Sequence, residues 1–219
     1  MILVPVKNLE SAKQRLAPVL DPAERLALAE AMLCDVLHAL SACSRRDEVA
    51  LVTGDGRARR VAADLRFHVI EDAVNRGESE AIAMATRVCV ERGATYTLVL
   101  PGDIPLITVD EVEAIFTAAS ENIGTVLAPS ASGRGSNAVL RCPADLFQLR
   151  FGNDSFPPHL AAARATGHPV TVLPLPGVGL DVDDPADLVT LLMTEGETRA
   201  QRLLRQWNVA RRLLAAAHG

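Results

Sequence analysis

The feature that most constrains this fold is an alternation of short apolar runs with longer amphipathic stretches over the first 120 residues. The pattern predicts a strand at Met1–Val6, then a helix at Pro22–Ala42 with Asp21 as its N-cap and Pro22 at its first position. Strands that alternate with helices in this way predict a mainly parallel sheet with helices on both faces. The expected fold class is therefore α/β, with three layers in the order helix, sheet, helix.

The alternation loosens after about residue 120, where apolar runs follow one another without helices between them. We therefore expect an antiparallel element in that part of the sheet. No linker, repeat or low-complexity tract interrupts the chain, so residues 1–219 are predicted to form one domain. The other predicted strands are Glu48–Thr53, Phe67–Glu71, Tyr96–Leu100, Gly124–Pro129, Asn137–Arg141 and Val170–Pro174. The other predicted helices are Arg57–Leu65, Glu78–Arg92, Thr108–Ser120, Phe156–Thr166 and Pro185–Met193.

The tail from Glu195 to Ala217 is rich in Arg and Leu at helical spacing and contains the only Trp, Trp207. This spacing predicts one amphipathic helix over residues 195–217. The helix would dock either on the domain itself or on a partner subunit of a homodimer. A functional role for the tail is the weaker interpretation.

Composition excludes several classes of protein. With 3% aromatic residues and a formal net charge of −5, the chain lacks the stacking surface and the basic runs of nucleic-acid-binding proteins. Its four cysteines are widely spaced, which is typical of thiols in a reducing cytoplasm and not of a zinc site. The apolar N-terminus is too short for a signal peptide, and no window approaches the about 18 apolar residues that cross a membrane.

The segment Tyr96–Pro105 provides the first candidate functional residue. Its apolar run ends in Pro101-Gly102, and Asp103 follows at once. Open α/β sheets bind ligands beyond the carboxyl ends of their strands, where a carboxylate can hold a divalent cation against phosphates. The alternative is a turn aspartate that caps its own backbone. A second acidic cluster, which contains Asp181 and Asp183, favours the metal site.

Three cations, Lys7, Lys13 and Arg15, follow the first predicted strand. A loop at this position lies at the ligand edge of the sheet, so these side chains could clamp a triphosphate. The segment is neither a P-loop nor a dinucleotide fingerprint, because G-x-x-x-x-G-K-[ST] and G-x-G-x-x-G are both absent. The alternative is a solvated charged surface.

The opening segment Pro5–Leu16 resembles that of the phospho-carboxylic-acid guanylyltransferases, which make an early intermediate of the deazaflavin coenzyme F-420. Five motifs occur in order and cover roughly residues 1–192, which leaves the tail outside the match. The later motifs are Gly102–Pro105, Gly135–Leu140, Arg150–Ser155 with His159, and Leu180–Leu188. The resemblance implies a Rossmann-like, three-layer α/β/α nucleotidyltransferase fold, similar to that of enzymes acting on sugars and on molybdopterin.

The chemistry implied by the resemblance is transfer of GMP from GTP to the phosphate of a three-carbon acid, with release of pyrophosphate. The family's acceptors are 2-phospho-L-lactate, phosphoenolpyruvate and 3-phospho-D-glycerate. Because an oxygen of the acceptor attacks the α-phosphorus, catalysis needs positioning and charge neutralisation rather than a protein nucleophile.

The resemblance also implies roles for individual residues. Mg²⁺ would be held by Asp103 and Asp181, with Asp183 as a further ligand. Catalysis would rest on Asp103 together with Lys13 and Arg15, which would stabilise the departing pyrophosphate. The implied nucleotide-binding residues are Lys7, Lys13, Arg15 and Ser79.

The resemblance places the acceptor on Asn137, Gly152 and Ser155. Backbone N–H groups around Gly152 and the Ser155 hydroxyl would form a nest for a carboxylate or phosphate. The alternative for Ser155 is to cap the helix that begins near Phe156, and the alternative for Asn137 is a turn residue. His159, one turn inside that helix, is expected to be a satisfied or solvent-facing histidine.

The chain departs from the family pattern at Gly77–Ala81. Members carry Leu-Asn-x-Ala before the middle helix, whereas this chain has Glu78 and Ser79 at the first two of these positions. The departure leaves the selection of guanine over another purine open. Either side chain could contact a base edge, and the alternative is that both simply open the helix.

Two other functions stay open at this point. A nucleotidyltransferase acting on a sugar phosphate or on molybdopterin is disfavoured. Such enzymes usually have a glycine-rich loop between the first strand and the Lys-Arg segment, whereas Pro5–Asn8 contains no glycine. A non-catalytic GTP-binding module is disfavoured because the chain retains both Asp103 and Asp181, and a protein that only binds GTP has less need of metal-binding acids. The expected partners are therefore GTP and a small phosphorylated carboxylic acid, in the cytoplasm, with no nucleic acid and no membrane.

Overall fold

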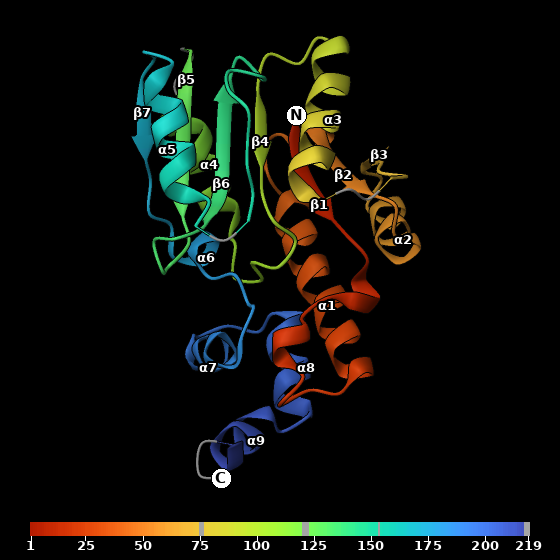
Figure 1. The fold of residues 1–219 in the computed structure, drawn as a ribbon. Coiled ribbons are helices and arrows are strands. Elements are labelled where there is room, and N and C mark those ends of the chain that lie inside the picture. Colours follow the sequence, from red (N-terminus) through yellow and green to blue (C-terminus); the bar gives the residue numbers. More distant parts are fainter. Residues whose placement is uncertain (75–76, 120–122, 153, 217–219) are drawn as a thin grey trace.

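The computed structural model describes residues 1–74, 77–119, 123–152 and 154–216. Its centre is a seven-stranded sheet with the strand order β3-β2-β1-β4-β6-β5-β7 (Figure 1). The strands are β1 (Ile2–Val6), β2 (Val49–Thr53), β3 (His68–Glu71), β4 (Thr97–Val99), β5 (Gly124–Pro129), β6 (Ser136–Cys142) and β7 (Val170–Val172). Each predicted strand is present, with bounds that differ by at most two residues.

Helices follow the predicted strands as the alternation indicates. The first begins where the sequence predicts, because the Asp21 carboxylate accepts the N–H of Glu24 at 2.9 Å and Glu24 caps Asp21 in return. In chain order the helices are α1 (Pro22–Ser41), α2 (Gly56–Asp64), α3 (Glu78–Glu91), α4 (Val109–Ala119), α5 (Phe156–Ala165), α6 (Pro176–Gly179), α7 (Pro185–Met193), α8 (Arg199–Gln206) and α9 (Val209–Ala216). Short 3₁₀ turns at Leu9–Ser11, Gln14–Leu16 and Arg46–Glu48 were not predicted.

Both faces of the sheet are covered, which confirms the three-layer α/β/α fold. On one face, Val4 and Leu51 pack in a core with residues of α1, α2 and α4. On the other face, Leu3 and Ala50 pack in a core with residues of α3 and α5. Adjacent residues of one strand thus enter opposite cores, which explains why the strands are apolar throughout and not alternating.

The predicted antiparallel element is β6. It runs antiparallel to both neighbours, β4 and β5, whereas β1 pairs in parallel with β2 and β4, and β7 pairs in parallel with β5. Because β6 is reversed, its first residues lie at the same edge of the sheet as the last residues of β1 and β4. The sequence between Pro129 and Ser136 is therefore a hairpin connection at that edge.

The C-terminal tail corrects one prediction, because it forms two helices where the sequence pattern predicts one over 195–217. α8 ends at Gln206 with Trp207 as its C-cap, and α9 begins after Asn208, whose φ of 53° lies in the left-handed region. A residue in that region cannot continue a right-handed helix, so the chain turns at this point. Residue 217 of the prediction lies outside the described residues.

The tail docks on the chain's own first helix. Buried side chains of α8, Ala200 and Leu204, pack in a third apolar cluster with Leu28 and Met32 of α1. Asp35 of α1 also accepts the N–H groups of Arg199 and Ala200, each at 2.9 Å, and so caps α8. In Figure 1 both helices lie beneath the sheet, with α8 beside the lower half of α1 and α9 below it.

No helix in the described ranges is both long enough and apolar enough to cross a membrane.

Candidate active site

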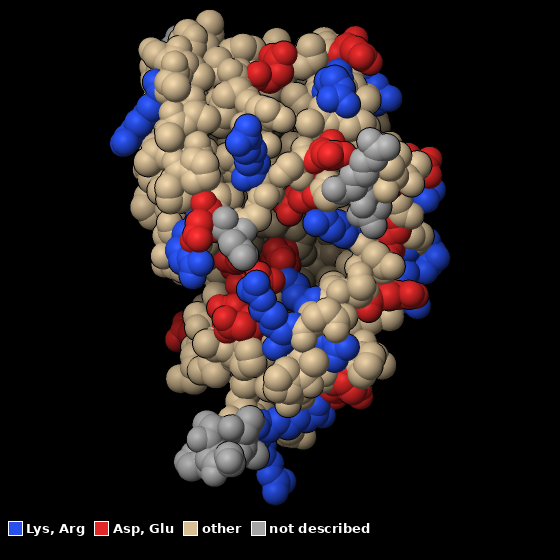
Figure 2. Space-filling model, viewed as in Figure 1, with Lys and Arg blue, Asp and Glu red and all other residues tan. Residues whose placement is uncertain are grey.

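The candidate site lies at the carboxyl ends of β1 and β4. The strand order changes direction between these two strands, and open α/β sheets bind ligands at such a switch point. Two distant segments meet there, since the N–H of Val182 donates to the carbonyl of Asp103 at 3.1 Å. Figure 2 shows a hollow in this region, between the sheet and the C-terminal helices, with acidic and basic side chains around it.

Lys13 is the central side chain of this site. Its ammonium lies 2.5 Å from Asp103 Oδ2 and 2.9 Å from Asp183 Oδ1, and only 7% of its side chain is exposed. Burial alone would lower the pKa of Lys13, but the charges of Asp103 and Asp183 outweigh it and raise that pKa. The backbone of Lys13 is left-handed, with φ 57°, which is uncommon for a residue with a side chain. Lys13 is therefore a buried, fully charged cation between two carboxylates.

Asp181 approaches the same region but lacks a cation among the described residues. Its Oδ1 accepts a hydrogen bond from Asn137 Nδ2 at 2.9 Å, and the same amide donates to the carbonyl of Val178 at 2.9 Å. Burial raises the pKa of Asp181; the Asn137 hydrogen bond opposes that rise, and the charge of Asp103 adds to it. Asn137 is buried, so it orients Asp181 and is not a solvent-facing turn residue.

Two pockets flank the Lys13 ion pairs. The first lies between the β1 loop, α1 and the corner after β4, and its polar lining includes Lys7, Lys13, Glu78 and Asp103. The second lies between the hairpin after β5, the loop before α5 and the segment before α7. Its polar and glycine lining includes Arg15, Ser130, Ser132, Arg134, Gly135, Gly152, Asp154, Asp181 and Asp183. The ion pair between Lys13 and Asp183 therefore joins a residue of one pocket to a residue of the other.

The three predicted phosphate-binding cations do not gather at one point. Lys7 is exposed and lines the first pocket, Lys13 is buried between the carboxylates, and Arg15 is exposed and lines the second pocket. A ligand that reached from one pocket into the other would pass all three.

Glu78, which the sequence left open as a contact to a base edge or as a residue that opens the helix, lies in this site. It is the first residue of α3, it faces the first pocket, and no hydrogen bond to its carboxyl group is found among the described residues. Burial, and then the charge of Asp103, raise the pKa of Glu78 to about 7. The only sequence signal was its departure from the family pattern, because burial of this side chain depends on the tertiary fold.

Ser79, the predicted nucleotide-binding residue, contacts the backbone of another loop. Its hydroxyl accepts the N–H of Phe151 at 2.8 Å and lies 3.4 Å from the carbonyl of the same residue. The first turn of α3 is thereby attached to the loop that leads to Gly152.

The predicted acceptor residues come from two segments that the fold holds together. Ser155 is buried and its hydroxyl accepts the backbone N–H of Ser136 at 3.0 Å. It makes no side-chain cap on α5, so the structure does not bear out the capping alternative for Ser155. Gly152 lines the second pocket with φ 144°, a conformation that favours glycine. Asn137 and Ser136 begin the reversed strand β6 beside them.

The carboxylates suit Mg²⁺ in chemistry but not yet in arrangement. No three His, Cys, Asp or Glu side chains of the described residues lie close enough together to share a metal ion. Between two of these carboxylates lies Lys13, whose ammonium is the cation that Asp103 and Asp183 share. Carboxylate oxygens are the ligands that Mg²⁺ prefers, and Asp181 is a partly buried acid with no cationic partner among the residues that the structure describes. The residues therefore fit the ion, provided that Lys13 moves.

Comparison with known proteins agrees with this geometry. A family model described as "Guanylyl transferase CofC like" matches residues 1–214. A phosphoenolpyruvate guanylyltransferase of Conexibacter woesei is 37% identical over 190 residues, which are 86% of this chain and 85% of the relative. A 2-phospho-L-lactate guanylyltransferase of Methanothermobacter thermautotrophicus is 33% identical over 204 residues, which are 93% of this chain and 89% of the relative.

The fold also matches a solved structure. A protein of Desulfovibrio desulfuricans G20, assigned as a nucleotide-diphospho-sugar transferase, superposes with a TM-score of 0.78 over 97% of this chain and 96% of that chain. At 21% identity this match shows a shared fold. Together with the family match over nearly the whole chain, it shows that this protein is a nucleotidyltransferase and belongs to the family of CofC-like guanylyl transferases.

Proposed function

We propose that this chain transfers GMP from GTP to a phosphorylated three-carbon acid, phosphoenolpyruvate or 2-phospho-L-lactate, and releases pyrophosphate. The observation that carries the proposal is the Lys13 ammonium held by Asp103 and Asp183 between two pockets. A transfer between two anionic substrates needs a cation and metal-binding acids between two binding sites. The names of the relatives, which include both acids, support these acceptors.

In this reaction an oxygen of the acceptor's phosphate attacks the α-phosphorus of GTP. The bond from the α-phosphorus to the oxygen that bridges to the β-phosphorus breaks, and pyrophosphate leaves with that oxygen and its electron pair. The product holds GMP and the acid in a new P–O–P linkage. Because both bonds join phosphorus to substrate oxygen, catalysis rests on alignment and on neutralising charge.

The first pocket suits the nucleotide. Lys7 and Lys13 are its cations, and Arg15 lies on the path into the second pocket, so the three follow the expected course of a triphosphate. Mg²⁺ would be held by Asp103 and Asp181, with Asp183, and would supply charge neutralisation on the phosphates. Ser79 belongs to this side of the site through its place on the first turn of α3.

The second pocket suits the acid. Gly152, Arg15 and Asp181 line it. Asn137 and Ser155 lie behind the lining, where Asn137 orients Asp181 and Ser155 holds the adjoining strand. The backbone around Gly152 and the guanidinium of Arg15 are suitable partners for a carboxylate or a phosphate.

We assign the reaction to coenzyme F-420 biosynthesis on the resemblance of the five motifs. All four cysteines, Cys34, Cys43, Cys89 and Cys142, are free thiols. This supports a reducing compartment such as the cytoplasm.

The test is release of pyrophosphate from GTP and Mg²⁺ with phosphoenolpyruvate, 2-phospho-L-lactate or 3-phospho-D-glycerate, each alone, with the product identified by mass. We expect release with one of the first two acids, and less with ATP or CTP in place of GTP. Asp103→Asn should be inactive, whereas Asp110→Asn, an exposed acid on α4, should match the wild type. Turnover with none of the acids, or full activity of Asp103→Asn, would overturn the proposal.

A further inference from the structure

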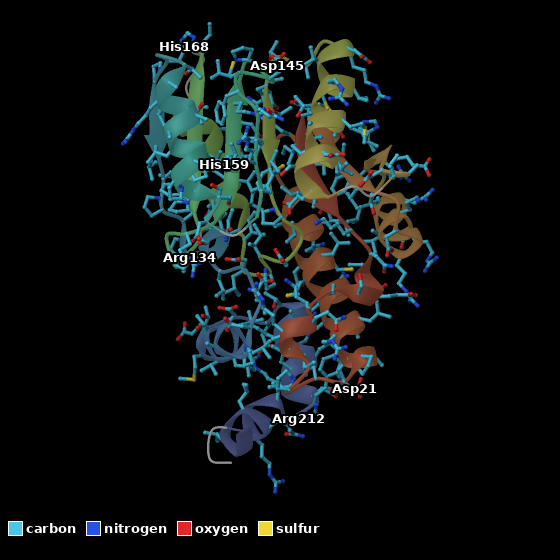
Figure 3. All side chains as sticks on the ribbon, in the orientation of Figure 1. Asp21, Arg134, Asp145, His159, His168 and Arg212 are labelled. Carbon is cyan, nitrogen blue, oxygen red and sulfur yellow. The ribbon has the colours of Figure 1, made fainter. Side chains whose placement is uncertain are left out.

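His159 is a buried imidazole that touches neither pocket. It lies on α5 with 1% of its surface exposed, and both ring nitrogens have partners. Nε2 lies 2.9 Å from the backbone nitrogen of Arg150, and Nδ1 lies 2.9 Å from Ser136 Oγ. Figure 3 shows His159 between α5 and the sheet, above the level of Arg134. The ring therefore joins the loop before α5 to the start of β6.

These contacts define the tautomer of His159. The backbone nitrogen of Arg150 can only donate, so Nε2 must accept and carry no proton. The single proton of the neutral ring then lies on Nδ1 and is donated to the Ser136 hydroxyl. Burial, and then the charge of Arg141, lower the pKa of His159 to about 4, so the ring stays neutral near neutral pH. If the ring were protonated, Nε2 and the backbone N–H of Arg150 would both be donors, and this hydrogen bond would be lost.

The two segments that His159 joins are those predicted to bind the acceptor. Arg150 and Phe151 lead directly into Gly152, and Ser136 is followed directly by Asn137. The Phe151 ring also packs edge-on against the imidazole, with the ring centres 5.1 Å apart.

Two further links support the same junction. The hydroxyl of Ser155 accepts the N–H of Ser136 at 3.0 Å, and the N–H of Phe156 donates to the carbonyl of Arg134 at 2.8 Å. Arg134 and Asp154 form an ion pair across its outer edge. Ser136, Ser155 and His159 are all buried in this junction, and His159 contacts both segments through its two ring nitrogens.

We infer that His159 is a positioning residue for the acceptor acid, which fixes the spacing between Gly152 and Asn137 through its two hydrogen bonds. The inference rests on the proposed function, since it takes the second pocket as the acceptor's site. A fully buried ring cannot touch a substrate, so its effect must pass through the Arg150 backbone and the Ser136 hydroxyl. The first pocket shares neither contact and is linked to this loop through Ser79, so the affinity for GTP should change much less than that for the acid.

Two substitutions separate the two hydrogen bonds. His159→Gln places an acceptor near the former Nε2 and keeps the Arg150 contact, whereas His159→Asn places a donor near the former Nδ1 and keeps the Ser136 contact. Ser136→Ala removes the hydroxyl and leaves the histidine in place. His168→Asn is the matched control, because His168 is exposed and lies beyond the far end of α5, as Figure 3 shows.

We expect the KM for the acid to rise by about fivefold to tenfold in each His159 variant, as for loss of one hydrogen bond, with the KM for GTP within about twofold. Ser136→Ala should raise the KM for the acid in the same way and add little in His159→Gln, which has already lost that contact. Equal rises for both substrates, or a lower melting temperature with an unchanged acid KM, would overturn the inference.

Failure of the inference and failure of the proposed function are distinguishable. If no turnover is detected, the affinity of the wild type and of the His159 variants for each acid, measured by calorimetry without GTP, gives the same comparison. If the His159 variants bind the acid as tightly as the wild type does, the inference alone is overturned. Absence of pyrophosphate with normal acid binding overturns the proposed reaction alone, and absence of acid binding to the wild type overturns both.

Discussion

Lys13 and Asp103, ninety positions apart in the sequence, are joined by an ion pair of 2.5 Å at the switch point of the sheet. Asp183 contacts the same ammonium at 2.9 Å. A cation therefore already occupies the place between the two acids, and it is supplied by the protein itself. The first two predictions follow from this arrangement.

Removal of the Lys13 charge should strengthen binding of Mg²⁺ in the absence of nucleotide. In Lys13→Met the two carboxylates lose their shared cation, and their mutual repulsion favours a divalent ion in its place. We expect the Kd for Mg²⁺, measured by calorimetry, to fall by about tenfold or more, while turnover is lost. Lys7→Met is the control, since Lys7 is exposed and has no ion pair within the described chain. Weaker or unchanged Mg²⁺ binding in Lys13→Met would contradict this account.

Asp103→Asn should reduce turnover by several orders of magnitude while the protein stays folded. The amide oxygen can still accept a hydrogen bond from Lys13, and Asp183 keeps the ammonium paired, so the buried charge retains a counter-ion. The lost negative charge, however, removes a ligand suited to Mg²⁺. Steady-state kinetics and thermal unfolding of the same preparation check both parts. A fall in stability that accounts for the whole loss of activity would count against the metal role.

Glu78 should make the wild type less stable as pH rises from about 4.5 to about 7. The pKa of its carboxyl group is raised from 4.5 to about 7 in the folded protein, so over this range the folded state binds more protons than the unfolded state. Stability must then fall with rising pH across this interval. The advantage of Glu78→Gln over the wild type, in free energy of unfolding, should therefore grow between these values and stay constant above them. Glu80→Gln, an exposed acid in the same turn, should show no such trend.

Leu204→Ala should destabilise the protein without changing either substrate constant. Leu204 is fully buried in the cluster that joins α8 to α1, and its own side chain lines neither pocket. Loss of such a side chain costs about 2–5 kcal/mol of unfolding free energy. Met193→Ala is the control, because Met193 is 81% exposed. A normal stability for Leu204→Ala in denaturant titration would contradict the docking of the tail.

The sheet and its layers were predictable because each depends on local pattern. Strands that are buried on both faces are apolar throughout. Helix starts such as Asp21-Pro22 are marked by an N-cap residue followed by a proline in the first turn. Asp103 was likewise predictable from its place after a strand. The tail was predicted less well, because helical spacing continues through Asn208 although that residue takes a left-handed conformation that Asn tolerates.

The contacts within the site were not predictable, because they join segments that are distant in sequence. No local pattern shows that Lys13 contacts an acid 170 positions away. Ser155 has a suitable type for a helix cap, but its backbone is helical rather than extended, so its hydroxyl turns to Ser136 instead. His159 was expected to be either hydrogen-bonded or solvent-facing. Both ring nitrogens are hydrogen-bonded, and their partners lie on segments that only the tertiary fold brings next to the ring.

The attachment of Ser79 to Phe151 has a consequence for how kinetics of this site are interpreted. One hydroxyl ties the first turn of α3, whose Glu78 lines the first pocket, to the loop that leads to Gly152 in the second pocket. A substitution at Ser79 will therefore change the constants for both substrates, whether or not its side chain touches a base. Under the proposed assignment of the pockets, the change in the KM for the acid measures how far the two pockets are mechanically coupled. Only a change in the KM for GTP beyond that coupling would report a direct contact between Ser79 and the nucleotide.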